Sequence, residues 1–333
     1  MRKKWIALLM SAILILSAAV LAGCGGDNQE TDAKESPTAA ADQEDTAENS
    51  AEDTQSSIQD TEYPLTITDG LGDEVTFEKE PERVISLAPA STEILFALGA
   101  GDRVKGRTDY CSYPEEASKV QSIGTYSAPN TELIISMEPD VVFATDYVDD
   151  SIREQVEATG AKVVVYTAGN VSVVLDTILQ MGLILNLNKN AAELLDSMRA
   201  DLEEIEQIVA SNQEEKSVFV DLGSFYSVGP GALLYDMLDR IGVTNITADT
   251  ETAYPQLSVE SIIEKNPDIY ISLYSSPDEL KQTAGLHELD CIKNDNIIFF
   301  EALSNEADII QRPSPRVVEG IRFLAEKIYP DLF

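Results

Sequence analysis

Few side chains in this 333-residue chain have the types and spacing that catalysis or metal binding would need. The single histidine, His287 in GLHELDC, has no second histidine with which to hold a metal ion. Cys111 and Cys291 lie 180 positions apart, so we expect two separate thiols, with a disulfide as the alternative. Neither lies in a Cys-x-x-Cys or Cys-x-His pattern, so we expect no metal site. The chain also lacks a Gly-x-Ser-x-Gly elbow and a Gly-x-x-x-x-Gly-Lys-[Ser/Thr] phosphate loop. We therefore predict no catalytic residue, no cofactor and no enzyme activity.

Tyrosine side chains offer a different chemistry, which is the covering of a broad apolar ligand. Rigid aromatic faces can cover an apolar ring system while phenol hydroxyls hydrogen-bond to its polar rim. Ordinary half-buried packing would explain any one tyrosine equally well, but a set in neighbouring loops favours a ligand. Five tyrosines fall in loops that we expect to follow strands or precede helices: Tyr110, Tyr126, Tyr147, Tyr226 and Tyr254.

The chain carries the same helix-to-strand joint twice. ELIISMEPDVVFA begins at Glu132, and ESIIEKNPDIYIS begins at Glu260. Asn130 and Ser258 precede the two stretches and are good helix N-caps. A glutamate two residues later stabilises the helix dipole by about 0.3–1 kcal/mol. That role explains each glutamate by itself, but it explains less well why both joints keep one. The repeat predicts two similar units.

The elements around these joints have the pattern of parallel α/β structure. Residues 65–81 predict a β-hairpin, and fully apolar runs such as VVFAT and KVVVYT alternate with helical segments. Apolar strands that alternate with helices indicate parallel sheets covered on both faces. We therefore predict two Rossmann-like α/β lobes, an N-terminal lobe over residues 63–169 and a C-terminal lobe over residues 216–333.

Two helices can be recognised from the sequence, one by its start and one by its apolar stripe. STEILFALG predicts a helix with Ser91 as its N-cap. Residues 170–215 are predicted to hold linking helices, and an apolar stripe over residues 190–211 predicts one long amphipathic backbone helix. A coiled-coil segment is the alternative, but the stripe is short. Two open α/β sheets joined by a stiff helix would leave a ligand cleft beyond the carboxyl ends of their strands.

The amino-terminal residues have the pattern of an export signal. Arg2, Lys3 and Lys4 precede an apolar run that ends in LAGC, which resembles the lipobox of bacterial lipoproteins. The resemblance implies a signal peptide over residues 1–23 and a lipidated, palmitate-type anchor at Cys24. An uncleaved membrane-spanning helix is the alternative. We expect a protein anchored by lipid at the extracytoplasmic face of the cell membrane.

The charge of the chain is strongly one-sided. The formal net charge is −36, from 59 acidic and 23 basic residues, which argues against nucleic acid as a partner. Residues 24–62 are acidic and polar, with Lys34 as the only base and Ile58 as the only strongly apolar residue. Such a segment cannot bury enough surface to offset its ordering entropy, so we predict a disordered acidic tether.

Several longer stretches carry a family resemblance. TDGLGDEVTFEKEPERVISLAPASTEILFALGAGD, LHELDCIKNDNIIFF and the terminal helix resemble solute-binding lipoproteins of ABC importers. The resemblance covers roughly residues 63–333 and is to the helical-backbone class that takes up cobalamin, iron–siderophores and haem. It implies a monomeric receptor that docks on an ABC permease dimer through both lobes. In that family one glutamate at the outer tip of each lobe meets permease arginines, and Glu132 and Glu260 match these positions.

The cobalamin-binding members of the family are the most similar. The likeness lies in GRTDYCSYPEEASKVQSIGTYSAPNTELI, AYPQLSVESII and ADIIQRPSPRVV. Those members have tryptophans where this chain has Tyr126 and Tyr254, and this chain has no tryptophan after Trp5. The identity of the corrinoid therefore stays open. The resemblance implies these ligand contacts: Tyr110, Tyr126, Phe225 or Tyr226, Tyr254, Asp308 and Arg312.

The residue types available for the cleft also rank the alternative ligands. A ferric siderophore complex is often anionic, so its receptor would need several cationic side chains in the cleft. Only Arg107 and Arg312 are candidates for this role. Arg316 is better explained as a helix-start residue. Haem would ask for an axial ligand, and His287 is badly placed to supply one. We therefore predict capture of cobalamin or another corrinoid without covalent chemistry. A siderophore receptor, then a haem receptor, are the nearer alternatives. An extracellular enzyme or an adhesion-type surface module is more distant.

Overall fold

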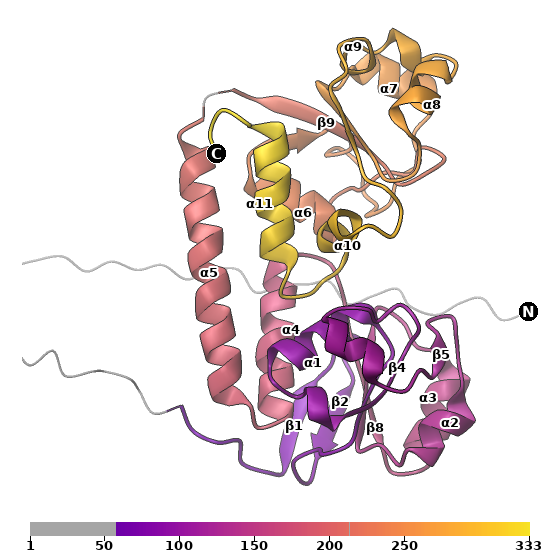
Figure 1. The fold of residues 1–333 in the computed structure, drawn as a ribbon, viewed down its shortest axis with the longest axis vertical. Coiled ribbons are helices and arrows are strands. Elements are labelled where there is room, and N and C mark those ends of the chain that lie inside the picture. The colour runs from indigo at the N-terminus through magenta and orange to yellow at the C-terminus, as the bar shows by residue number, and fades with distance from the viewer. Residues whose placement is uncertain (1–57, 213) are drawn as a thin grey trace, which may run out of the picture. The chain divides into compact units, whose positions relative to one another are not determined.

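Two four-stranded parallel sheets with the same strand order organise the described chain (Figure 1). The computed structural model describes residues 58–212 and 214–333, so the predicted signal peptide, Cys24 and most of the predicted tether lie outside the described residues. The strands of the two sheets are β3 (Val84–Ser86), β4 (Val104–Arg107), β7 (Val141–Thr145), β8 (Lys162–Tyr166), β9 (Lys216–Asp221), β10 (Val243–Asn245), β11 (Ile269–Ser272) and β12 (Ile297–Phe299).

The strand order repeats from one lobe to the other. The N-terminal sheet has the order β4-β3-β7-β8, and the C-terminal sheet has the order β10-β9-β11-β12. In each sheet the strand that comes first in the chain lies between the second and the third, and all pairs are parallel. The central strand β7 is buried along its whole length, as an apolar strand covered on both faces must be. The predicted pair of similar α/β lobes is confirmed.

Helices and short hairpins surround the sheets. The predicted hairpin near the start of the N-terminal lobe is confirmed as an antiparallel pair. The helices are α1 (Pro89–Ala97), α2 (Thr131–Ser136), α3 (Asp150–Glu157), α4 (Val171–Ile184), α5 (Asn188–Ala210), α6 (Leu233–Arg240), α7 (Val259–Lys265), α8 (Pro277–Gln282), α9 (Asp290–Lys293), α10 (Asn305–Gln311) and α11 (Val317–Ile328). The hairpin strands are β1 (Leu65–Thr68), β2 (Glu74–Phe77), β5 (Gly124–Thr125) and β6 (Ala128–Pro129).

The long helix α5 is the predicted backbone helix. It has 23 residues and is therefore about 35 Å long. One face packs against α4 and α11, which lie beside it in Figure 1. A single apolar core includes residues of both sheets together with this face, so the lobes share a core through the linking helices. The buried residues of the face are Ala191, Leu195, Met198, Leu202, Ile205 and Val209.

Two of the three predicted N-cap residues are confirmed. The side chain of Asn130 accepts a hydrogen bond at the start of α2, and that of Ser258 does so at the start of α7. The prediction for Ser91 is wrong, because α1 begins at Pro89 with Ala88 as its N-cap residue. Proline at the first helical position has a suitable φ and needs no partner for an N–H, so this helix can begin without a side-chain cap.

The Pro-Asp of each repeated joint has the same structural role in both lobes. Asp140 Oδ2 accepts hydrogen bonds from the backbone N–H groups of Glu82 and Arg83, both at 2.9 Å. Asp268 Oδ2 accepts from the N–H of Ser217 at 2.8 Å and from its hydroxyl at 2.6 Å. Each carboxylate therefore ties the start of the third strand to the start of the first. This role explains the repeated aspartate but not the repeated glutamate.

Contacts between the chain and the linking helices begin at Thr61, slightly ahead of the predicted start of the N-terminal lobe at residue 63. The backbone N–H of Thr61 donates to Asn186 Oδ1 at 2.7 Å, and its hydroxyl donates to the carbonyl oxygen of Leu183 at 2.8 Å. These bonds attach the chain to the turn between α4 and α5. The predicted domain boundaries otherwise stay predictions.

Candidate functional site

The five predicted ligand-contact tyrosines are all exposed in loops that follow strands. Tyr110 and Tyr147 follow β4 and β7, and Tyr126 lies between β5 and β6. Tyr226 follows β9, and Tyr254 lies between β10 and α7. Their relative exposure ranges from 40% for Tyr126 to 61% for Tyr147. Aromatic rings left so uncovered are typical of binding surfaces, and the carboxyl ends of strands are where open α/β sheets bind ligands.

Asp146 lies close to tyrosines of both lobes. It follows β7 directly, and the Tyr126 hydroxyl donates to the carbonyl oxygen of the preceding Thr145 at 2.8 Å. Partial burial raises the pKa of the Tyr126 and Tyr254 phenols, and the negative charge of Asp146 raises both further. Because Tyr254 belongs to the C-terminal lobe, the Asp146 carboxylate is within electrostatic reach of both lobes. Asp146 was not among the predicted site residues.

Phe225 and Tyr226, the alternatives for one aromatic contact, have different surroundings. Phe225 packs against an apolar cluster inside the C-terminal lobe. Tyr226 is exposed, and its backbone forms a bridge with Gln256. Ser224 and Phe225 both have left-handed backbone conformations, with φ of 53° and 61°, which turn the loop after β9 sharply. Of the two rings, Tyr226 is the one that is open to a ligand.

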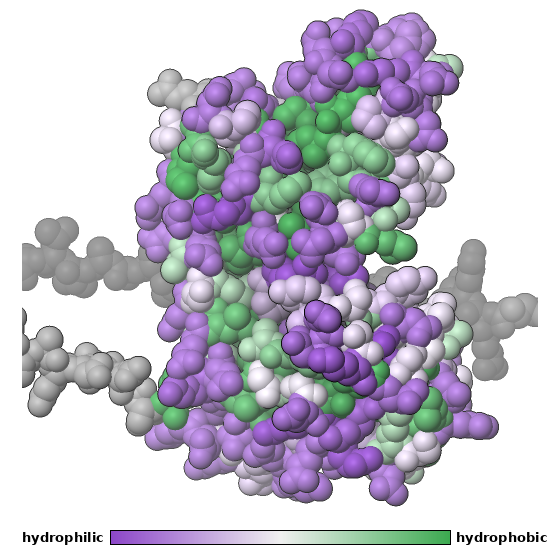
Figure 2. Space-filling view, viewed as in Figure 1, coloured by the Kyte–Doolittle hydropathy of each residue, from purple (hydrophilic) through white to green (hydrophobic). Residues whose placement is uncertain are grey.

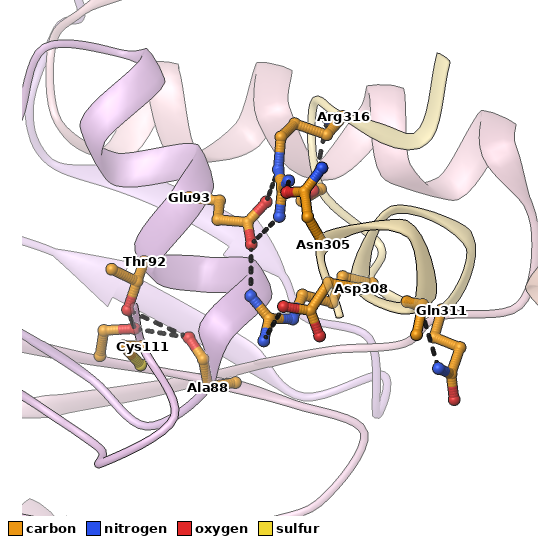
Figure 3. Close-up of polar contacts among 12 residues, drawn as sticks. Ala88, Thr92, Glu93, Cys111, Asn305, Asp308, Gln311 and Arg316 are labelled. Carbon is orange, nitrogen blue, oxygen red and sulfur yellow. Dashed lines mark hydrogen bonds and ion pairs between the residues drawn. The ribbon is translucent and has the colours of Figure 1, made fainter. Parts of the chain in front are cut away.

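A buried cluster of charges joins the two lobes (Figure 3). Glu93 of α1 accepts hydrogen bonds from Arg312 Nη1 at 2.8 Å and from Arg316 Nε at 3.0 Å. The predicted polar pair is present, because Arg312 Nη2 lies 2.7 Å from Asp308 Oδ2. The Arg316 guanidinium also lies 3.9 Å from the ring centre of Tyr113, which belongs to the N-terminal lobe. The Glu93 side chain is only 2% exposed, so its charge depends on these partners.

This cluster changes the interpretation of its arginines. The sequence analysis gave Arg316 only the start of the last helix; it does precede α11, but it also reaches Glu93 on the other lobe. Arg312 is bound by two carboxylates, those of Glu93 and Asp308, and its ligand contact stays a prediction. Burial raises the pKa of the Asp308 carboxyl, against the neighbouring arginines that lower it. The sequence offered only one signal for Glu93, a charge within an otherwise uncharged helix.

Arg107, the second predicted cation of the cleft, is hydrogen-bonded to backbone oxygens. Its Nη1 donates to the carbonyl oxygens of Thr108 at 3.0 Å and Asp109 at 3.1 Å. Its Nη2 donates to the carbonyl oxygen of Ser118 at 3.1 Å. These bonds fix the loop between β4 and β5. Both cations that the sequence offered for an anionic ligand therefore already have partners.

The two predicted docking glutamates are exposed and have equivalent places in the two lobes. Glu132 lies in the first turn of α2, which leads into β7, and Glu260 lies in the first turn of α7, which leads into β11. Within residues 58–212 and 214–333 neither carboxylate forms an ion pair or a side-chain hydrogen bond. The helix starts are already capped by Asn130 and Ser258, so neither glutamate is needed for that purpose.

Two further apolar side chains are exposed after strands of the C-terminal sheet. Tyr274 follows β11 and is 67% exposed, and Leu303 follows β12 and is 80% exposed. The aromatic ring of Tyr274 lies against Gly223, in the loop that also carries Tyr226. Tyr274 was not among the predicted contacts, because its position at the end of the apolar run DIYISLY indicated a strand and not a loop.

Two hollows lie away from the tyrosines. One, of about 830 Å³, lies beside β12 and the end of α11, and its apolar lining includes Ile298, Phe299 and Phe323. Figure 2 shows apolar surface on the visible face of the C-terminal lobe amid a mostly hydrophilic exterior. A second hollow, of about 700 Å³, includes Pro139 and Lys162 at the amino ends of the N-terminal strands. Open α/β sheets bind ligands at the opposite ends of their strands, so we give these hollows less weight than the tyrosines.

The described residues hold no group of three or more histidine, cysteine, aspartate or glutamate side chains that could bind a metal ion. Cys111 and Cys291 are separate buried thiols, as predicted. His287 lies near the end of a short helical turn, and its ring Nδ1 is 3.5 Å from the carbonyl oxygen of Thr283. Among residues 58–212 and 214–333, no helix has the length and apolar character needed to cross a membrane.

Comparisons with known proteins agree with this arrangement. The family model described as periplasmic binding protein matches residues 84–302. The chain is 33% identical to an uncharacterized ABC transporter substrate-binding lipoprotein, YvrC, of Bacillus subtilis, over 97% of each chain. It is 27% identical to a cobalamin-binding protein of Halobacterium salinarum, over 80% of this chain and 74% of that protein.

A solved structure is similar over the same region. It is that of a possible iron-binding, periplasmic solute-binding protein from Staphylococcus epidermidis, and the sequence identity is 28%. The TM-score is 0.66, and the match covers 75% of this chain and all of that one. The names of the last two proteins state different ligands, cobalamin and iron.

Proposed function

The chain belongs to the family of periplasmic binding proteins, and from this membership we propose that it captures a corrinoid and delivers it to an ABC importer. The observation that carries the proposal is the set of exposed tyrosines in loops after the strands of both lobes. A corrin is a broad, largely apolar disc edged by amides. Aromatic faces from two sides can cover such a disc while phenol and carboxylate groups bond its rim.

The charges near the tyrosines support a corrinoid over an anionic siderophore complex. Arg107 and Arg312, the two candidate cations, are bound by backbone oxygens and by carboxylates, respectively. Asp146 adds a negative charge beside Tyr126 and Tyr254. A ligand with several carboxylates would meet an unfavourable field there, whereas amide N–H groups would find an acceptor. The similarity to a cobalamin-binding protein points the same way.

An iron–siderophore complex is the second candidate. It is favoured by the likeness to a possible iron-binding protein, at 28% identity. Neutral or cationic siderophore complexes would avoid the charge conflict that Asp146 creates for anionic ones. The two candidates differ in colour and shape, so one binding experiment separates them.

Retention of cobalamin by the purified protein tests the proposal. Mixed with excess cyanocobalamin and desalted, the protein should stay red, with one equivalent of ligand bound. We expect a dissociation constant in the nanomolar range, which corresponds to a binding free energy of about −12 kcal/mol. If the protein elutes colourless and instead retains a ferric hydroxamate under the same conditions, the ligand is a siderophore complex and not a corrinoid.

We further propose that Glu132 and Glu260 dock the two lobes on the two halves of a permease dimer. Both are exposed, both lie in the first turn of the equivalent helix of their lobe, and both lack partners among the described residues. A pair of carboxylates repeated with the fold is suited to a partner that presents the same surface twice. Cys24, as a lipid anchor, would hold the receptor near such a partner at the membrane.

Replacing Glu132 and Glu260 together by alanine should leave ligand affinity unchanged and reduce transport at least tenfold, because charge pairs at a docking surface set register and encounter rate. Uptake of radiolabelled ligand by proteoliposomes that contain the cognate permease measures this effect. The double variant Glu193→Ala with Asp196→Ala, on the exposed face of α5, is the matched control for the loss of two charges. Equal uptake by the two double variants would contradict the docking role.

A further inference from the structure

We propose that Asp146 sets the charge selectivity of the tyrosine surface, accepting hydrogen bonds from N–H-bearing groups of a ligand and disfavouring ligands with a carboxylate nearby. The inference rests on the proposed function, since it assumes that the ligand binds among Tyr126, Tyr147 and Tyr254. It goes beyond that function by naming the residue that decides between neutral and anionic members of one ligand class.

The backbone holds Asp146 in a fixed position. Its φ is 61°, a left-handed conformation that is uncommon for residues other than glycine. The backbone N–H of Asp146 donates to the carbonyl oxygen of Tyr166 at 2.6 Å. Its Oδ1 accepts a hydrogen bond from the N–H of Ala168 at 2.9 Å. Both partners lie at or just beyond the end of β8, the neighbouring strand, so the side chain is tied to the sheet edge.

One carboxylate oxygen remains available. In the part of the chain that the structure describes, Asp146 Oδ2 forms no hydrogen bond and the carboxylate forms no ion pair. The two candidate cations from the sequence, Arg107 and Arg312, have other partners. The negative charge of Asp146 is therefore not balanced by a protein cation, and a bound ligand would experience it directly.

The place of Asp146 brings this charge to both lobes. Tyr126 donates its hydroxyl to the carbonyl oxygen of Thr145, so the phenol and the carboxylate come from adjacent positions. Tyr147, the next residue, is 61% exposed. Across the lobes, Tyr254 is near enough for the Asp146 charge to raise its phenol pKa. A ligand covered by these rings would therefore lie next to the free carboxylate oxygen.

The competing explanation is that Asp146 only fixes its own loop. Asparagine separates the two roles, because its side-chain oxygen can still accept the hydrogen bond from Ala168 while the charge is lost. A purely structural role predicts no change in the selectivity of Asp146→Asn. A role in charge selection predicts a change in selectivity without a change in stability.

The experiment compares cyanocobalamin with corrinoids in which one peripheral amide has been hydrolysed to a carboxylate. Titration calorimetry gives the ratio of dissociation constants, acid over amide, for each single-carboxylate isomer. For the wild-type protein we expect a ratio of about ten or more for at least one isomer, from one like-charge contact at an effective dielectric between protein and water. For Asp146→Asn we expect that ratio to fall to about one to three.

Asp176→Asn is the control, because Asp176 is an exposed acid on α4 and its loss changes the net charge equally. It should keep the wild-type ratio, and both variants should keep the wild-type melting temperature. If corrinoids bind but no isomer distinguishes Asp146→Asn from the wild-type protein, the inference about Asp146 is wrong and the proposed function stands. If the wild-type protein binds no corrinoid, the proposed function fails and takes the inference with it.

Discussion

Replacing Glu93 by alanine should lower the free energy of unfolding by about 3–5 kcal/mol, because it leaves the buried Arg316 guanidinium without its carboxylate and removes one of the two carboxylates that bind Arg312. Glu93 accepts hydrogen bonds from Arg312 and from Arg316, and its own side chain is only 2% exposed. Arg316 would keep only Asn305 and the face of Tyr113 as partners. Neither carries the negative charge that a buried arginine needs.

Urea unfolding followed by circular dichroism measures this effect. The control is Glu204→Ala, which removes an exposed ion pair between α5 and α11, with Arg322 Nη2 at 3.1 Å from Glu204 Oε2. Exposed pairs contribute at most about 1 kcal/mol, so the two variants should differ clearly. Glu93→Ala and Glu204→Ala with equal unfolding free energies would show that the buried cluster adds no stability.

Truncating Tyr126 and Tyr254 together to alanine should weaken corrinoid binding by a factor of about 10²–10³, because aromatic anchors of a binding surface contribute up to several kcal/mol between them. Tyr126 belongs to the N-terminal lobe and Tyr254 to the C-terminal lobe, so the double variant removes one aromatic face from each side. Both rings are about half exposed without a ligand, and little packing would be lost on truncation. The free protein should therefore unfold at nearly the same urea concentration.

Calorimetric titration with cyanocobalamin is the measurement, and two sets of variants make it specific. Tyr126→Phe and Tyr254→Phe keep the rings and remove the hydroxyls. They therefore separate the contribution of the aromatic rings to ligand binding from the contribution of hydrogen bonds. Phe299→Ala truncates an exposed aromatic side chain in the hollow beside β12, away from the tyrosines, and should leave the dissociation constant unchanged. If Phe299→Ala weakened binding and the double tyrosine variant did not, the ligand would belong in that hollow.

The paired joints show how much a repeated pattern can predict. Asn130 and Ser258 cap their helices as expected, and the two joints lead into the third strand of two sheets with the same order. The structure adds the reason for the shared Pro-Asp, since each aspartate ties two strand starts together. It leaves both glutamates exposed, as docking on a partner requires.

The sequence by itself determined the features that depend on neighbouring residues. Apolar periodicity predicted the buried strands, the two lobes and the helix α5, because burial on one face or both is written into the spacing of side chains. The positions of the tyrosines in loops after strands followed from the same reasoning. The start of α1 was missed because proline at its first position replaces the side-chain cap that Ser91 would have supplied.

Only the tertiary structure decided which charges face which. Glu93 and Arg316 are 223 residues apart in the chain and meet because the two lobes share one core. Asp146 comes near Tyr254 for the same reason, and Phe225 turns inward because of a left-handed turn that its sequence does not signal. Electrostatic contacts between distant segments depend on how whole lobes pack. That packing cannot be predicted from the local spacing of residues.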